Sequence, residues 1–322
     1  MQTASKQVRA VPLAQGNSTL DSHRYRPNHL MMNRIQTNPQ SGIVLVLCLG
    51  LLCLVCLSGC VTGGNTGKHA FSTGTKRWTN SLGMVFVPVP GTKTYFSVWE
   101  TRVKDYAAFA GTNASVDPSW RHPLYHNTDP VSFAPDHPAT SVSWTEAKQF
   151  CAWLTAKEQA EKLIPTDVVY RLPTDEEWSW AVGIGGRETN GTPQNKNAKL
   201  RDVYPWGTQW PPPPGAGNYA DVTARKHFTN WADIVIPGYD DGFVTTAPVG
   251  SFKPNALGIY DLGGNAVEWC QDWYNEKHTQ RVFRGGAWVN CGPKSLLSSS
   301  RGATGPNRRS VITGFRCVLA WK

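Results

Sequence analysis

The chain has 322 residues, a formal net charge of +9 at pH 7 and 17% charged residues. Its densest basic cluster holds four arginines, Arg301, Arg308, Arg309 and Arg316. They are spaced too widely for a helix that tracks phosphates, which excludes a nucleic-acid partner and favours solvated surface or internal hydrogen bonding. The 14 tryptophans, 30 glycines and 23 prolines indicate a loop-rich fold ordered by buried indoles and tight turns.

The N-terminal segment has the features of a secretion leader. Residues 43–57 form an uncharged apolar run that follows Arg34. This run is shorter than the ~20 apolar residues of a membrane-spanning helix and suits the apolar region of a signal peptide. At its end, Leu57-Ser58-Gly59-Cys60 resembles the lipobox of bacterial lipoproteins. We therefore expect residues 1–59 to be removed and Cys60 to carry the lipid.

The predicted product is an exported lipoprotein, anchored to a membrane of the bacterial cell envelope. The alternative is a single-pass anchor whose cysteines have no role. Residues 1–30 are polar and longer than a leader requires, which indicates a true start at Met31 or Met32. Removing the leader lowers the formal net charge from +9 to +5, because it holds Lys6, Arg9, Arg24, Arg26 and Arg34 against Asp21.

The remaining chain divides into a tether and one domain. Residues 60–79 are rich in Gly, Thr, Ser and Asn and predict a flexible tether. Residues 80–322 predict one domain, because tryptophans recur along this whole stretch. Short strands are expected at 84–89 and 95–99, followed by a helix over 103–110 that Gly111 ends.

Two capping boxes predict the next helices. Ser143 and Glu146 begin the first, and Thr174 and Glu177 begin the second. Apolar residues at helical spacing give each helix an inward face, namely Ala147, Phe150, Cys151 and Leu154 in the first and Trp178 and Ala181 in the second. From Tyr204 onward helix signals vanish, so turns and short aromatic segments are expected.

Several segments in fixed order resemble the formylglycine-generating-enzyme (sulfatase-modifying-factor) family. They cover nearly all of residues 80–322 and read GMVFVPVPG (83–91), WETRVKDYAAF (99–109), HPATSVSWTEAKQFCAWL (137–154), YRLPTDEEWSWA (170–181), YPWG (204–207), DDGF (240–243), APVGSFKPNALGIYDLGGNAVEW (247–269), RVFRGGAW (281–288) and TGFRC (313–317). The resemblance implies an α+β fold related to C-type lectins, with little regular secondary structure.

The resemblance also implies two calcium sites. Calcium takes oxygen ligands from carboxylates, amides and backbone carbonyls. The residues that match the first site are Asp221, Val222, Asp241 and Phe243, and those that match the second are Asp261, Gly264, Ala266 and Glu268. The alternative is that these are ordinary turn residues, since Asp and Gly are common turn formers.

An exported chain with four cysteines beyond Cys60 is expected to form disulfides. The resemblance implies a bridge between Cys151 and Cys317. A second family bridge would fall near Val182 and on Ser298, so both of its cysteines are missing. Cys270 and Cys291 each flank a strand-like aromatic segment, VEW and GGAW, and a local bridge between them is expected.

The departure from the family lies after Gly285-Gly286. Active members use two cysteine thiolates that hold Cu(I), a soft metal suited to sulfur ligands. Here the segment reads AWVNCGPKSLLSSSRG, with Asn290 in place of the first thiolate, Ala287 in place of a serine and Cys291 as its sole cysteine. We expect no copper site and no oxidase chemistry. The minority alternative makes Cys291 a nucleophile.

Other metal patterns are absent from the sequence. His122, His126 and His137 show no H-x-x-x-H or H-E-x-x-H spacing and are expected to be loop or packing residues.

Three functions follow. The favoured one is a lipid-anchored, calcium-stabilised module that presents a groove to a peptide or glycan. The second is a formylglycine-generating oxidase acting on exported sulfatases, as membership alone would imply. The third, an iron-dependent enzyme of the sulfoxide-synthase type, ranks last because its His-bearing helical partner domain is not found in the sequence.

Overall fold

The computed structural model describes residues 70–72, 74–231 and 234–322. The chain divides into units at residues 1–63 and 64–322. The first unit, with the predicted leader, lies outside the described residues, as do Cys60 and most of the tether. Within the described ranges, no helix combines the length and apolarity needed to cross a membrane.

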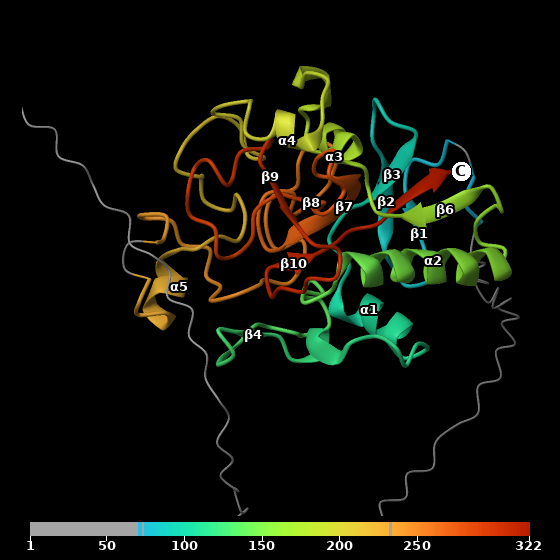
Figure 1. Ribbon diagram of the computed structural model, residues 1–322, viewed down its shortest axis with the longest axis horizontal. Helices are drawn as coiled ribbons and strands as arrows, with labels where there is room; N and C mark the ends of the chain where they lie inside the picture. Colours follow the sequence, from blue (N-terminus) through green and yellow to red (C-terminus); the bar gives the residue numbers. More distant parts are fainter. Residues whose placement is uncertain (1–69, 73, 232–233) are drawn as a thin grey trace, which may run out of the picture. The chain divides into compact units, whose positions relative to one another are not determined.

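A five-stranded antiparallel sheet joins the two ends of the domain. Its order is β1-β2-β3-β11-β6, with β11 paired to β3 on one side and β6 on the other. The strands are β1 (Trp78–Thr79), β2 (Val85–Pro88), β3 (Thr94–Ser97), β6 (Val168–Arg171) and β11 (Val318–Trp321). The strands expected at 84–89 and 95–99 are therefore present as β2 and β3, which pair with each other, and β3 lies beside the C-terminal strand β11 (Figure 1).

A four-stranded sheet carries most of the second half of the chain. Its order is β10-β7-β8-β9, and the β10–β7 pair is parallel. The strands are β7 (Val267–Trp273), β8 (Arg281–Arg284), β9 (Arg301–Thr304) and β10 (Thr313–Gly314), while β4 (Leu124–Tyr125) and β5 (Asp129–Pro130) form a separate hairpin. The prediction that VEW is part of a strand is confirmed, since it lies in β7. The prediction that GGAW (285–288) is strand-like is wrong, since these residues form a loop after β8.

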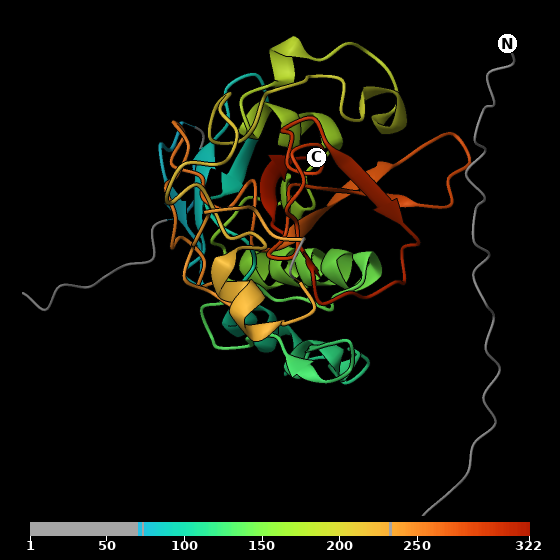
Figure 2. The same cartoon turned by 90° about the vertical axis from the view of Figure 1, so that its left-hand side faces the viewer.

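The helices are α1 (Val103–Ala110), α2 (Trp144–Ala160), α3 (Asp175–Ala181), α4 (Pro193–Lys196) and α5 (Val222–His227). Pro118–Arg121 and Gly185–Arg187 form single 3-10 turns. Figures 1 and 2 show α2 running along the strands, with α1 on the side of α2 away from them. The described chain is thus α+β with short elements, as predicted.

The sequence correctly predicted α1, α2 and α3, and the last two begin at the predicted capping boxes. In α2, Ser143 Oγ accepts from Glu146 N at 3.2 Å, and Glu146 Oε2 accepts from Ser143 N at 2.9 Å. Thr174 and Glu177 form the same reciprocal pair at the start of α3. The expectation that no helix follows Tyr204 was wrong, because the Asp221 carboxylate caps α5 by accepting from Ala224 N at 2.7 Å.

Aromatic packing fills the core, as the composition indicated. Trp178, Trp269 and Trp288 are almost fully buried. At the N-terminal end, Phe71 is buried against Trp78 with ring centroids 5.7 Å apart. The packed domain therefore begins before residue 80, inside the predicted tether, because a buried phenylalanine holds this stretch against the sheet.

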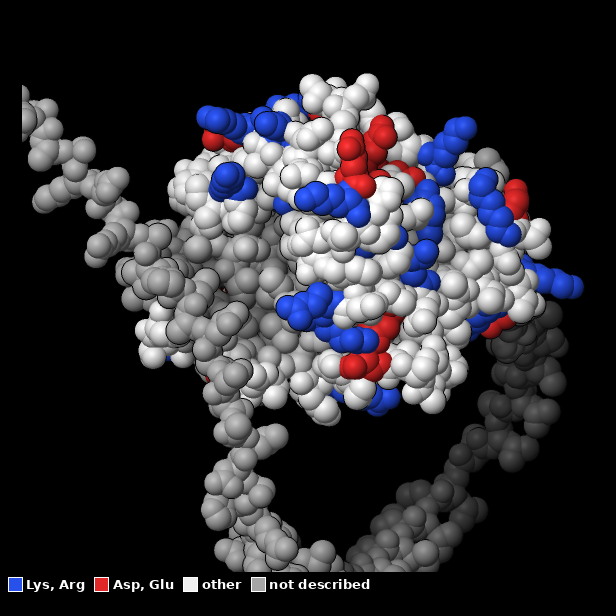
Figure 3. Space-filling model, in the orientation of Figure 1, with Lys and Arg blue, Asp and Glu red and all other residues white. Residues whose placement is uncertain are grey.

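Several arginines form ion pairs with buried carboxylates inside the domain. Arg284 and Arg301 both contact the buried Asp175, and Arg316 pairs with Glu268. Two members of the predicted arginine cluster thus serve internal hydrogen bonding. Figure 3 shows Lys and Arg on one face in separate groups interspersed with Asp and Glu.

Candidate functional site

Two glycines bring the end of β8 against a neighbouring loop. Gly285 has φ +80°, in the left-handed region that favours glycine. A Cβ on Gly286 would lie 2.4 Å from the Leu296 side chain and 3.0 Å from Gly263 O. A larger residue at position 286 would therefore push the segment after β8 away from Gly263 and Leu296. The two glycines allow this segment to pack closely against the loop at Gly263.

The Asn290 side chain closes a turn in this segment. Its Oδ1 accepts from Ala287 N at 2.8 Å, and its own N–H donates to Ala287 O at 2.9 Å. Its carbonyl accepts from Ala220 N at 3.1 Å. At the position where the resemblance places the first thiolate, the chain thus has an amide that serves the backbone.

Cys291 follows this turn and is half-buried between two apolar clusters. Burial raises the pKa of its thiol, and a backbone hydrogen bond offsets this in part. Reactive cysteines instead have lowered pKa values, since the thiolate is the nucleophile. The half-buried position of Cys291 and the raised pKa of its thiol therefore give no support to the alternative that Cys291 is a nucleophile.

The other three described cysteines are fully buried thiols. Cys151 Sγ on α2 lies 3.4 Å from Cys317 Sγ, next to β11. That distance exceeds the ~2.05 Å of a disulfide, but the thiols are in contact, so oxidation needs only a small shift.

The local bridge between Cys270 and Cys291 is not formed in the structure. Cys270 packs among Trp178, Val282 and Val318, whereas Cys291 packs against other clusters. The reason is that GGAW leaves the sheet and carries Cys291 away from β7.

The first predicted calcium site holds two adjacent carboxylates. Asp221 Oδ2 accepts from Asp241 N at 2.6 Å. Asp241 in turn accepts from Tyr219 N at 2.8 Å and from Phe243 N at 2.9 Å. Val222 follows directly as the first residue of α5. The residues named for this site therefore lie together, in bonds that ordinary turn residues would also make.

Electrostatics favour a cation at this pair. Burial, with Asp221 nearby, raises the pKa of Asp241 to about 7, and burial also raises the pKa of Asp221. Among the described residues, no Lys or Arg forms an ion pair with either carboxylate. Each oxygen has a second lone pair, so the pair fits a hard cation with oxygen ligands.

The second predicted site is a tight loop before β7. Asp261 and Asn265 have φ +59° and +67°, and a Cβ on Gly264 would lie 2.6 Å from Asn218 O. Asp261 Oδ2 accepts from Gly250 N at 2.7 Å. Its Oδ1 is buried without a partner, which leaves an oxygen for a ligand.

Glu268 is already neutralised in this arrangement. Arg316 donates through Nε at 2.7 Å and through Nη2 at 2.5 Å to its two oxygens. Trp178 Nε1 adds a bond of 3.0 Å. Glu268 would have to share its oxygens between the guanidinium and a metal ion.

Glu100 is a site residue that sequence reasoning missed. It is fully buried, and its oxygens accept from Asn265 Nδ2 at 2.7 Å and Ala266 N at 2.9 Å. Burial, then Asp261 and Glu268, raise its pKa. The signal was an acid inside the WETR segment, whose role depends on a loop far along the chain. Glu100 thus adds a third buried acid near Asp261 and Glu268.

Within the described ranges, no three His, Cys, Asp or Glu side chains converge to hold a metal ion on their own. Each calcium site would therefore need backbone carbonyls as ligands. His137 Nδ1 instead contacts Thr246 Oγ1 at 3.0 Å, and His122 packs on Phe133, in line with packing roles.

Comparison with known proteins identifies the scaffold. Residues 70–321 match the family described as sulfatase-modifying factor enzyme 1-like domain. The chain belongs to this family. The formylglycine-generating enzyme of Bos taurus is 30% identical over 218 residues, which are 62% of this chain and 48% of that protein. The chain thus spans about half the length of the curated formylglycine-generating enzymes it matches.

Other relatives carry different names. The inactive C-alpha-formylglycine-generating enzyme 2 of Bos taurus is 31% identical over 194 residues, 57% of this chain and 50% of that protein. The chaperone protein LppX of Paenibacillus barcinonensis is 26% identical over 265 residues, 73% and 84% of the two chains. A solved structure, Treponema denticola variable protein 1, is 19% identical with a TM-score of 0.48, covering 77% of this chain and 100% of that one.

Proposed function

We propose that this protein is a lipid-anchored binding module of the bacterial cell envelope, built on the family scaffold without its oxidase chemistry. The observation that carries the proposal is the Asn290 turn, in which the amide bonds the backbone, at the position that the family resemblance gives to the first copper thiolate. One thiol at Cys291 does not make a two-thiolate copper site.

The remaining thiols do not replace the missing pair. Cys151, Cys270 and Cys317 are fully buried, and burial raises the pKa of Cys151 and Cys270. Oxidation of a thiol by O₂ needs a metal or another redox centre. An inactive relative of similar identity supports loss of chemistry with retention of the fold.

Calcium is proposed as a structural ion. Asp221 and Asp241, with the Val222 and Phe243 carbonyls, would hold one ion. Asp261 and Glu268, with the Gly264 and Ala266 carbonyls, would hold the other, and Glu100 would add negative charge nearby. Each ion would supply positive charge to buried carboxylates and add stability by binding the folded state.

The binding role draws on a second relative. LppX of Paenibacillus barcinonensis is named a chaperone protein and covers more of this chain than the formylglycine-generating enzymes do. A surface that takes peptide segments of other exported proteins would suit a chaperone-like role. The second candidate function is formylglycine generation on exported sulfatases, which the enzymes named above favour.

Metal analysis of the purified full chain separates these functions. The proposal predicts calcium after dialysis against micromolar Ca²⁺, with copper and iron at background. Stoichiometric copper lost in Cys291→Ser would favour the oxidase and overturn the proposal. Stoichiometric iron would favour the sulfoxide-synthase type.

A further inference from the structure

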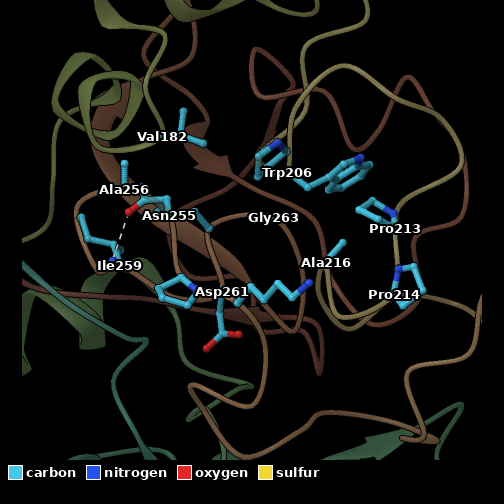
Figure 4. A pocket seen from close by; sticks show the side chains of 14 residues that line it. Val182, Trp206, Pro213, Pro214, Ala216, Asn255, Ala256, Ile259, Asp261 and Gly263 are labelled. Atoms are coloured by element: carbon cyan, nitrogen blue, oxygen red, sulfur yellow. Dashed lines mark hydrogen bonds between the residues drawn. The ribbon is translucent and has the colours of Figure 1, made fainter.

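A cavity of about 420 Å³ lies between the loop that follows Tyr204 and the loop that precedes Asp261. Figure 4 shows Pro213, Pro214 and Ala216 on one side, Asn255, Ala256 and Ile259 opposite them, and Trp206 above. Its volume is in the range of small-ligand sites. None of the family's expected thiolate positions lines it.

The wall of this cavity is held rigid. Trp206 stacks on Tyr204 with centroids 4.9 Å apart and planes 4° apart, and its Nε1 donates to Gln209 O at 3.0 Å. A Cβ on Gly263 would lie 2.5 Å from Pro205 Cγ. The ring faces and prolines are therefore positioned before any ligand arrives, which lowers the entropy lost on binding.

Few polar groups of the lining are left for a peptide, because the unpartnered Asp261 Oδ1 belongs to the second predicted calcium site. Asn255 Oδ1 accepts from Leu257 N and Ile259 N, and its Nδ2 donates to Ala181 O. Proline has no N–H to offer. Lys253 lines the cavity, is exposed, and has no carboxylate within ion-pairing distance among the described residues. It is thus a cationic group available to a ligand at the rim.

We propose that this cavity binds an extended peptide segment by one aromatic or large aliphatic side chain, with a neighbouring carboxylate of the peptide paired to Lys253. This inference rests on the proposed binding function and names its ligand class. A saccharide fits less well, since the side chains of Pro213, Pro214 and Trp206 offer its hydroxyls no free hydrogen-bond partner.

The test uses the full chain in detergent with millimolar Ca²⁺ and fluorescent, end-capped heptapeptides in a glycine-serine background. The probe has a central phenylalanine followed by aspartate. Replacing the phenylalanine with alanine is expected to weaken binding about tenfold, as for the loss of one buried ring. Replacing the aspartate with lysine is expected to weaken binding about fivefold, because the ion pair at the exposed Lys253 is lost. Fluorescence anisotropy reports the affinities.

Three variants connect binding to this cavity. Ala256→Trp fills it from an exposed position and should abolish binding. Lys253→Glu should reverse the preference toward the lysine peptide. Lys199→Glu, an exposed site with the same charge change, is the matched control and should bind as the parent does. Circular dichroism verifies that each variant is folded.

Equal binding of all peptides, no binding by the folded parent, or binding that Ala256→Trp leaves intact would overturn the inference. Displacement of the probe by a sulfated disaccharide at equal concentration would overturn the peptide class. None of these results bears on copper or oxidase activity, so failure here is distinguishable from failure of the proposed function.

Discussion

Arg316 and Glu268 form a fully buried, two-bond ion pair, with N–O distances of 2.7 and 2.5 Å between the loop before β11 and strand β7. Removing one member of such a pair leaves an uncompensated charge in a low dielectric. The pair therefore joins the two sheets and balances one of the carboxylates near Asp261.

Arg316→Met is expected to lower the free energy of unfolding by about 3–5 kcal/mol, because Glu268 stays buried without its partner. Urea unfolding measures the change. The matched control is Arg309→Met, whose pair with Glu146 is partly exposed and should contribute no more than about 1 kcal/mol. Equal losses of unfolding free energy in the two variants would show that the buried pair stabilises the fold no more than the partly exposed pair does.

Asp175 should make stability depend on pH. Burial alone would raise its pKa, but Arg284, Arg301 and Lys196 hold the pKa of this carboxyl well below its usual range. A lowered folded-state pKa contributes stability above the unfolded value of ~3.9 that is lost as pH falls below it. Asp175→Asn should lower stability at neutral pH and flatten the decline between about pH 4 and 2. Glu176→Gln, at an exposed neighbour, should keep the parental curve, and identical curves for both variants would refute the assignment.

Calcium should raise the melting temperature above that in EGTA. At a hundredfold excess over Kd, each site adds about 2.7 kcal/mol if the ion binds the folded state alone. Asp241→Asn and Glu100→Gln should each remove part of the shift, whereas Asp167→Asn at an exposed position should not. Identical melting in calcium and EGTA would count against both sites.

Mature protein should begin at Cys60 and carry fatty acids. Mass spectrometry of the membrane fraction measures both properties. A Cys60→Ala protein should keep its leader or leave the membrane. Lipidated, membrane-bound Cys60→Ala protein would contradict the predicted anchor.

Local chemistry accounts for what the sequence predicted well. The boxes at Ser143 and Thr174 each involve residues three apart, so their patterns are visible without a structure. Asp221 is an exception, because this acid both caps α5 and lies in a predicted metal site. The family resemblance assigned it to the metal site, and the helix that it caps was not predicted from the sequence.

Long-range contacts account for what was missed. Glu100 acquires its role from Asn265 and Ala266, and Glu268 loses its free charge to Arg316. Phe71 is in the core because distant strands meet there. No local sequence pattern predicts such long-range contacts. The family resemblance predicted site residues only where a motif residue has a known role in the family.

The central claim, a family scaffold without oxidase chemistry, is tested most directly by turnover. The full chain is incubated with Cu(I), reductant, O₂ and a peptide carrying the sulfatase cysteine motif, and mass spectrometry follows the cysteine. The account predicts an unchanged peptide, because Asn290, at the position that the resemblance gives to the first thiolate, is an amide that bonds the backbone. Conversion to formylglycine that disappears in Cys291→Ser would contradict it by showing that one cysteine suffices, and conversion that persists would reveal another metal site.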